Sequence, residues 1–457
     1  MIGTITYKVL SVLAAALLTV LSLRSCDDLA REVPATAAVE DVALPAEAPV
    51  VSILQGRGEI SQQLQVAADQ YLAANPGAVF HVQTIQSRSD YGAVLRSRLL
   101  AGERVDIFQI SGAGERQELA PYLSDLSDLE WLSGALDGSL NAVTDGGAIY
   151  GIPYSLEGAG LIINRRIFES AGIYLSGIAT LEALEEAFAQ LQDAIAAGEL
   201  AEAFPRLEAV TEFAAHDVDY LAALVSGLLL TDSFATAADT RTAMYLELPM
   251  EENAYGLIRL LALYSSCTSW DQLTRVSQVR QLEEGLGTER IACVYQSTEV
   301  YRALIAANPE LETRLELLPV PLGTEENRQV LYTETPAYWA VHNGSDDTAA
   351  QEAKKFLTWL YCSDSGSTLY ASRFQAVSPF RATAKDTGLP LHSHMLRQIE
   401  AGNSQLWHSN ELPVGWGVDV FAAGLQGVLA KESTWDAFVA DCRDQWHRER
   451  LLESSTE

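Results

Sequence analysis

The hydrophobic pattern from Val50 onward alternates between short apolar runs and longer amphipathic stretches. An apolar run at 50–54 predicts a strand, and the amphipathic stretch 59–74 predicts a helix that Asn75-Pro76-Gly77 would end. Further strands are predicted at 79–85 and 104–110, with a second helix between them. A β-α-β-α-β series of this kind predicts a mostly parallel sheet covered by helices.

The loops after two of these strands are candidate ligand sites. In a parallel sheet, ligands bind beyond the carboxyl ends of the strands. This rule draws attention to loops 55–58 and 111–115 and to three side chains within them. Gln55, Arg57 and Ser111 are therefore predicted to bind a ligand, although turn formation explains the same residue types equally well.

The segment from Asp145 to Ile173 combines a turn, a strand and a helix. Glycines give its start backbone freedom, and Pro153 favours an extended chain just before it. Leu161-Ile162-Ile163 then predicts a buried strand. Asn164 is a candidate N-cap of a helix that Gly172 would end.

Two parts of this segment resemble the signature of the extracellular solute-binding proteins of ABC importers, carbohydrate-binding type. These parts are Tyr150-Gly151-Ile152-Pro153 and Leu161 to Asn164. The resemblance implies an α/β chain with the periplasmic-binding-protein-like type II fold, in which a multi-strand hinge joins two α/β lobes. It also implies that the lobes close on a mono- or oligosaccharide and present it to ABC permease subunits.

The order of the later elements extends the resemblance to about residue 450. The resemblance implies a first lobe at 50–155 plus 315–360. It implies a second lobe at 156–314 plus 361–450, and 451–457 is predicted to be a tail. The sequence predicts further strands at 290–295, 315–322 and 338–342, and further helices at 181–195 behind Thr180, 217–230, 254–265, 297–308 and 349–362.

The resemblance also suggests which residues face the cleft between the lobes. Tyr154 and Glu157 lie in the first crossing between lobes, and Glu157 is the best candidate to accept hydrogen bonds from ligand hydroxyls. A solvated loop charge remains the alternative for Glu157. Gln296, Ser297 and Glu299 occupy a turn that faces the cleft in the family. The aromatic residue usual in that turn is absent, and helix capping would also explain Ser297 and Glu299.

Trp416 is the candidate for stacking on a sugar ring. It lies in Pro413-Val414-Gly415-Trp416-Gly417, which predicts an exposed, flexible loop, whereas Trp435 and Trp446 follow helical spacing and are predicted to be core. A packing role for Trp416 is the alternative.

The N-terminal 25 residues have the pattern of a secretory signal peptide. Lys8 precedes an uncharged apolar run, and Leu23-Arg24-Ser25-Cys26 approximates a lipoprotein cleavage box. Cys26 is therefore predicted to carry a lipid that anchors the protein to a membrane, with plain secretion or an uncleaved anchor as alternatives. Residues 26–49 are rich in Ala, Pro and Glu and predict a disordered tether.

The net charge of −31 argues against a nucleic acid partner, because such binding uses clustered Lys and Arg. The five cysteines show no CxxC spacing, which argues against zinc or redox chemistry. A disulfide between Cys267 and Cys293 stays open, and Cys442 is predicted to be buried. No cofactor is expected.

The common catalytic motifs are missing from the sequence, so we expect a binding protein rather than an enzyme. Three alternatives stay open. The same fold could bind a non-sugar solute such as a peptide, a polyamine or a metal complex. The chain could be a carbohydrate-active hydrolase that uses Asp106 or Glu157, or a surface adhesin. His392, His394 and His408 are more simply explained as solvated loop residues than as metal ligands.

Overall fold

The computed structural model describes residues 48–86, 88–322, 329–407 and 409–456. The predicted signal peptide, Cys26 and nearly all of the predicted tether lie outside these residues, and the folded body begins at Pro49. Within the described ranges, no helix is both long enough and apolar enough to cross a membrane.

The first lobe is built around a five-stranded sheet with the order β2-β1-β3-β12-β6. β1 (Val50–Gln55) pairs in parallel with both β2 (Val79–Thr84) and β3 (Ile107–Ile110), as the alternating pattern predicts. β12 (Tyr338–Val341) returns antiparallel to β3, and β6 (Ile152–Pro153) is antiparallel to β12. The carboxyl ends of β1 and β3 therefore open at one edge of this sheet.

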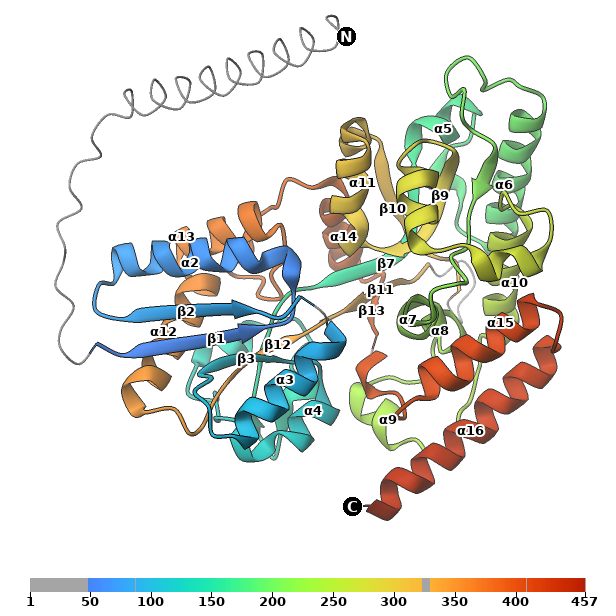
Figure 1. The fold of residues 1–457 in the computed structure, drawn as a ribbon. Coiled ribbons are helices and arrows are strands. Elements are labelled where there is room, and N and C mark those ends of the chain that lie inside the picture. The colour runs from blue at the N-terminus through green and yellow to red at the C-terminus, as the bar shows by residue number, and fades with distance from the viewer. Residues whose placement is uncertain (1–47, 87, 323–328, 408, 457) are drawn as a thin grey trace, which may run out of the picture. The chain divides into compact units, whose positions relative to one another are not determined.

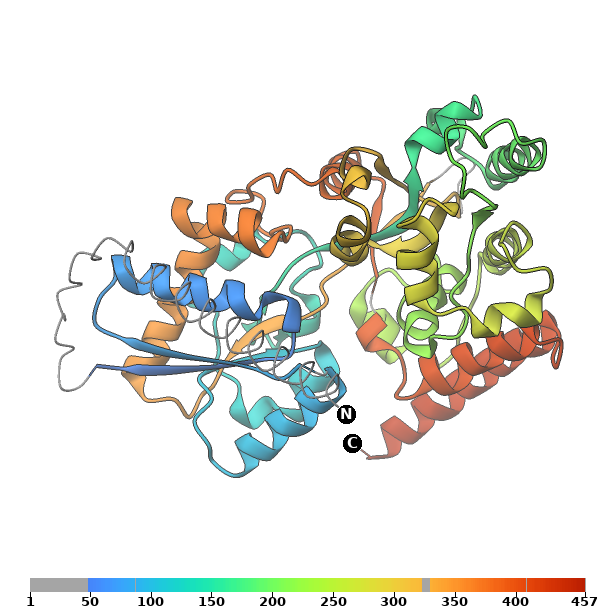
Figure 2. The ribbon, with the colours of Figure 1, turned by 45° about the horizontal axis from the view of Figure 1, so that its top comes forward.

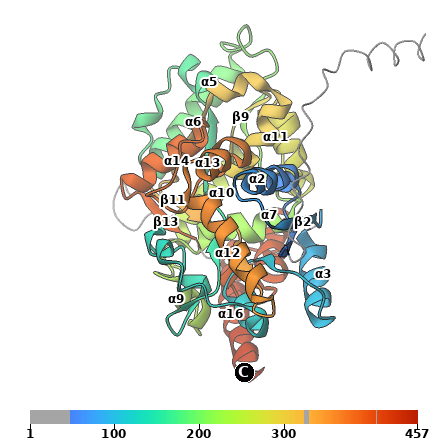
Figure 3. The same ribbon diagram turned by 90° about the vertical axis from the view of Figure 1, so that its left-hand side faces the viewer.

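Helices cover both faces of the first sheet. Val51 and Ile53 of β1 pack in a core with α2 (Ser61–Ala74) and α12 (Asp347–Cys362). Leu54 points to the opposite face, where α3 (Arg88–Leu100) and α4 (Ala113–Glu118) pack. Figures 1 and 3 show α2 and α3 on opposite sides of this sheet.

The second lobe contains a six-stranded sheet centred on β7 (Glu157–Asn164), whose eight residues are all buried. β9 (Ile291–Ser297), β10 (Leu315–Leu318) and β11 (Leu331–Glu334) pair antiparallel to β7. β8 (Ala209–Thr211) extends the sheet beyond β9, and β13 (Ser404–Leu406) extends it beyond β11. The prediction of a buried strand at 161–163 is confirmed.

Two cores flank the second sheet. One contains residues of α6 (Leu181–Ala196), α10 (Glu251–Leu263), α15 (Ala423–Leu429) and α16 (Trp435–Thr456). The other contains residues of α11 (Tyr301–Ala307) and α14 (Pro390–Glu400). Figure 2 shows α16 lying beside α15 along this lobe. The shorter helices are α5 (Arg165–Ser170), α7 (Val218–Tyr220), α8 (Ser226–Leu229), α9 (Ala237–Thr242) and α13 (Asp364–Leu369).

Within the described residues, the chain passes between the lobes at three places. It crosses from β6 to β7, returns from β11 to β12, and crosses again between Phe380, which packs in the first lobe, and Leu389, which packs in the second. Extended backbone makes the first two crossings, so the lobes are joined by strands.

The implied lobe boundaries differ from the structure in two segments. Residues 315–318 and 331–334 belong to the second lobe, because β10 and β11 hydrogen-bond to β7 and only β12 joins the first sheet. Tyr361, Tyr370 and Phe380 belong to the first lobe, where their rings pack under the first sheet. The predicted tail at 451–457 is wrong for its described residues, since α16 continues to Thr456.

Other local predictions had mixed outcomes. Thr180 caps α6 as predicted, by accepting from Ala183 N at 3.1 Å. Asn164 stands at the N-cap position of α5, but its side chain makes no capping hydrogen bond and donates to Glu289 instead. Cys267 and Cys293 are both free, and Cys442 is buried as predicted.

Candidate functional site

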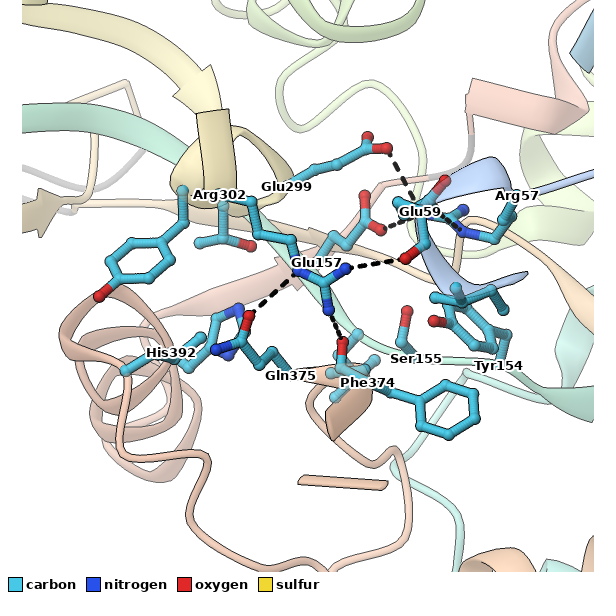
Figure 4. A pocket seen from close by; sticks show the side chains of 16 residues that line it. Arg57, Glu59, Tyr154, Ser155, Glu157, Glu299, Arg302, Phe374, Gln375 and His392 are labelled. Atoms are coloured by element: carbon cyan, nitrogen blue, oxygen red, sulfur yellow. Dashed lines mark hydrogen bonds and ion pairs between the residues drawn. The ribbon is translucent and has the colours of Figure 1, made fainter. Parts of the chain in front are cut away.

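Three segments that are distant in the sequence meet where the two lobes join. The first is the loop after β1, which carries Arg57 and Glu59. The second is the crossing from β6 to β7, which carries Tyr154 and Glu157, and the third is the turn after β9, which carries Glu299. Figure 4 shows the side chains of these residues converging on one pocket.

The side chain of Arg57 reaches from the first lobe toward the second. Its Nη2 lies 2.9 Å from Glu157 Oε1 and 3.4 Å from Glu299 Oε1. Its Nε donates to Glu59 Oε1 at 2.7 Å, and its guanidinium lies 5.0 Å from the centre of the Tyr154 ring. The guanidinium is thus held by three carboxylates and one aromatic face.

Burial and charge act in opposite directions on Arg57. Burial lowers the pKa of the guanidinium, but the carboxylates of Glu157, Glu299 and Glu59 more than compensate, so that its pKa is raised above the ordinary value. Tyr154 lies beneath it with its phenol in the core, and burial raises the pKa of that phenol. Arg57 is therefore a fixed positive charge at the junction of the lobes.

Glu157 is the first residue of β7 and is 9% exposed. The next residue, Gly158, donates its N–H to Thr298 Oγ1 at 3.1 Å. A Cβ at Gly158 would lie 2.7 Å from Met395 Sδ, so the absence of a side chain lets α14 pack against this crossing. Glu157 is positioned by strand pairing and close packing rather than by a free loop.

Arg302 of α11 makes a second connection between the lobes. Its Nε donates to Gln375 Oε1 at 3.1 Å and its Nη1 to the Glu59 carbonyl at 3.2 Å, while Nη2 donates to the Phe374 carbonyl. All three acceptors lie on the first-lobe side of the junction, and Figure 4 shows Arg302 between them.

The pocket that these side chains surround has a volume of about 60 Å³. Small-molecule pockets commonly measure about 300 Å³ or more. The space between these side chains is therefore smaller in this structure than a typical small-molecule pocket.

Two smaller cavities, of about 20 and 10 Å³, lie nearby. Residues of both lobes line the first, and residues of the second lobe line the other. Ser111, Thr335 and Glu411 line the first, whereas Glu157 and Ser297 line the second. Trp407 lines both, and its Nε1 donates to the Ala223 carbonyl at 2.9 Å. The first of these cavities therefore has a mainly polar lining, whereas the lining of the second is mainly apolar.

The profile of the bacterial extracellular solute-binding proteins matches residues 66–392 of this sequence. The chain belongs to this family. Family membership indicates a location outside the cytoplasm. No curated protein matches the sequence closely enough to count as a relative.

Solved structures of solute-binding proteins share this two-lobed, periplasmic-binding-protein-like fold. RafE from Streptococcus pneumoniae, in its apo form, is 15% identical, with a TM-score of 0.70 over 89% of this chain and 99% of that one. A cyclic alpha-maltosyl-1,6-maltose binding protein from Arthrobacter globiformis is 17% identical, with a TM-score of 0.64 over 88% and 99%. A chitin oligosaccharide binding protein is 16% identical, with a TM-score of 0.67 over 88% and 99%.

Five candidate residues of this solute-binding protein lie at the cavities just described. Arg57, Glu157 and Glu299 come together, and Tyr154 supports them from the core. Ser111 lies apart, at the cavity of Thr335 and Glu411.

Three other candidates make contacts that shape the protein. Gln55 is fully buried; its Oε1 accepts from Arg57 N and its Nε2 donates to Thr84 Oγ1, which orders the loop after β1. Gln296 is buried and donates to Gln281 Oε1 at 2.7 Å. Ser297 caps the turn by accepting from Glu299 N at 3.3 Å.

The prediction of an exposed Trp416 is wrong. Its side chain is fully buried, its Nε1 donates to the Cys442 carbonyl at 2.9 Å, and its ring packs edge-on against Trp446 at 5.3 Å. The flanking glycine allows the left-handed turn at Gly415 (φ 77°), which directs the indole into the core rather than to solvent.

The prediction of solvated loop histidines is wrong for His392 and His394. Both lie on α14, where His392 is buried beside Thr387 Oγ1 and His394 Nδ1 accepts from Leu317 N at 3.2 Å. Burial lowers the pKa of each to about 4. His408 lies outside the described residues, and the part of the chain that is described contains no cluster of three or more potential metal ligands.

The sequence reasoning missed Arg302, Trp407 and Glu411. Arg302 follows a predicted turn near the cleft and could have been found from its place one helical turn after Glu299. Trp407 and Glu411 follow a three-residue strand, β13, which is too short to produce a recognisable pattern.

Proposed function

We propose that this solute-binding protein captures a mono- or oligosaccharide between its two lobes and delivers it to an ABC permease. A lipid on Cys26 would anchor it to the membrane. Several structural neighbours that are named for carbohydrates, among them the binders of chitin oligosaccharide and of cyclic maltosyl-maltose, support the ligand class.

One observation carries the proposal: Arg57 of the first lobe meets Glu157 and Glu299 at the junction of the lobes. A sugar presents many hydroxyl donors and acceptors, and a buried polar group left unpaired costs about 1 to 3 kcal/mol. Fixed carboxylates and a fixed guanidinium match this requirement. Glu157 accepts from ligand hydroxyls, and Arg57 donates to them.

Binding proceeds through movement about the strands that join the lobes. The pocket of about 60 Å³ is too small for a sugar ring, so the lobes separate to admit the ligand. The ligand then contacts both lobes and favours their approach. It shifts this equilibrium only by its higher affinity for the closed form.

A cationic solute, such as a polyamine, is the second candidate. It is favoured by the three carboxylates that surround the single guanidinium of Arg57, since this surplus of negative charge would attract a second cation. If this candidate is right, the ligand amine binds the carboxylates, and hydrogen bonds to ligand hydroxyls contribute little to affinity.

Thermal unfolding in the presence of ligands tests the proposal. The purified protein is heated with mono- and oligosaccharides, amino acids and polyamines in parallel. A true ligand at about 100 times its Kd adds about 2.7 kcal/mol to the free energy of unfolding. Stabilisation by sugars supports the proposal, stabilisation by polyamines alone supports the second candidate, and no response in any class contradicts both.

A further inference from the structure

A further polar contact joins the lobes, apart from those of Arg57 and Arg302. The segment Ser409–Glu411 follows β13 in the second lobe, and Arg450 of α16 holds it there by donating to the Glu411 carbonyl at 2.7 Å. From this position Asn410 Nδ2 donates to the Ser111 carbonyl at 2.8 Å. Glu411 Oε1 accepts from Ala113 N, in the first lobe, at 2.9 Å.

The turn in the first lobe that makes this contact contains a glycine, Gly112, at the point of closest approach. A Cβ at Gly112 would lie 3.0 Å from Glu411 Oε1 and 3.1 Å from Asn410 Cβ. Any side chain at residue 112 would therefore press against the segment from the other lobe. The glycine permits the close approach, so the contact depends on how near the two lobes are.

Glu411 is only 4% exposed, and its surroundings compensate its charge poorly. Arg116 of α4 donates to Asp145, and Arg450 donates to Glu453 and to two backbone carbonyls. Across the described ranges, no arginine or lysine lies within ion-pair distance of the Glu411 carboxylate. The remaining charged or titratable groups that act on it are Arg241 of α9 and Tyr338 of β12, and the Tyr338 phenol is also influenced by Glu334 at the end of β11.

We propose that Glu411 makes the contact between the lobes sensitive to protons, with the protonated carboxyl favouring joined lobes and the carboxylate favouring separated ones. The reason is that separation returns this side chain to water, whereas joining buries it. An uncharged carboxyl loses little on burial and can still accept from Ala113 N. A buried carboxylate pays a desolvation cost that one N–H donor offsets only in part.

The direction of the effect follows from linkage. Burial raises the pKa of Glu411 in the joined form, although the Ala113 N–H and the arginines lower it. In the separated form the side chain is solvated, and its pKa returns to about 4.3. Joining the lobes therefore takes up a proton, and the joined form is favoured as the pH falls through the range above about 4.3. One proton changes the equilibrium by at most about tenfold per pH unit.

Small-angle X-ray scattering of the ligand-free protein between about pH 5 and about pH 7.5 tests this proposal. The radius of gyration of the wild type is expected to increase as the pH rises. Glu411→Gln keeps the acceptor without the charge and is expected to stay compact throughout. Glu411→Ala removes the acceptor and is expected to stay extended throughout.

Glu199→Gln provides the matched control, because Glu199 is an exposed carboxylate beyond the end of α6 and is expected to behave like the wild type. The chosen range also lies above the pKa of about 4 of His392 and His394. A wild-type radius that does not change with pH overturns the proposal, as does an undiminished pH response in Glu411→Gln. No ligand is present, so the result is independent of which solute the protein binds.

Discussion

Arg57 Nη2 and Glu157 Oε1 lie 2.9 Å apart although the two residues are 100 positions apart in the sequence. Arg57 follows the first strand of one lobe, and Glu157 begins the central strand of the other. Both side chains are almost completely buried. The pair thus links the two lobes at the point where the chain first crosses between them.

Glu157→Gln is expected to weaken ligand binding and to lower stability moderately. The amide keeps the shape of the side chain but removes one of the charges that hold Arg57. The loss of unfolding free energy is about 1 to 3 kcal/mol, because Glu59 and Glu299 still compensate the guanidinium. Denaturant unfolding and equilibrium binding measure the two effects. Glu310→Gln, at a carboxylate whose side chain is 70% exposed, is the control; equal affinity in both variants would remove Glu157 from the site.

Trp416→Ala is expected to reduce stability by about 3 to 5 kcal/mol, because a fully buried indole leaves a cavity. The Cys442 carbonyl also loses its donor. Trp416→Phe fills more of the space and should cost less. In both variants the ligand affinity of the folded protein stays within twofold of wild type, since we place this residue in the core. A large loss of affinity with normal stability would restore Trp416 as a ligand contact.

Arg302→Met is expected to loosen the junction of the lobes. The change removes three hydrogen bonds to Glu59, Phe374 and Gln375 but keeps much of the aliphatic stem. Hydrogen exchange of the segments around these acceptors should become faster, while exchange in α6 stays unchanged. Arg259→Met, in which a surface ion pair to Glu185 is lost, is the matched control. Unaltered exchange at the junction would show that Arg302 does not hold the lobes.

Stability is expected to fall as the pH falls from about 6.5 to about 4, because His392 stays neutral in the fold. Burial lowers its pKa to about 4, whereas the unfolded chain binds the proton near its ordinary pKa of about 6.5. As the pH falls, the unfolded state therefore binds the proton first. This lowers the free energy of unfolding, by about 3 kcal/mol for His392 once the pH reaches the folded pKa. His394 acts in the same direction. Chemical unfolding at several pH values measures the slope, and His392→Asn should reduce it; an equal slope in the variant would contradict this account.

The sequence predicted most of the fold because its strands and helices carry strong hydrophobic periods. The run after Val50 and the buried strand at Leu161 to Ile163 are examples, and both lie where the pattern placed them. Assignment to lobes was harder. The apolar pattern of Leu315–Leu318 would suit a strand in either sheet. Only its pairing with β7 shows that it belongs to the second lobe.

The candidate site was predictable only where a motif or a strand end marked it. Arg57 follows the end of the first strand and Glu157 follows the Tyr150–Pro153 motif, and the structure brings the two residues together. The prediction of an exposed Trp416 failed because the glycines that suggest a mobile loop also permit a tight turn into the core. Glu411 gave no signal, since its importance arises from the close approach of Gly112 in the other lobe, which no local pattern encodes.

A crystal structure of the protein with the sugar that stabilises it most would test the central claim directly. We predict that the sugar lies between the two lobes, that Glu157 accepts a hydrogen bond from one of its hydroxyls, and that Arg57 donates to another. A sugar bound on the outer surface of one lobe, or one that makes no contact with either residue, would contradict the account.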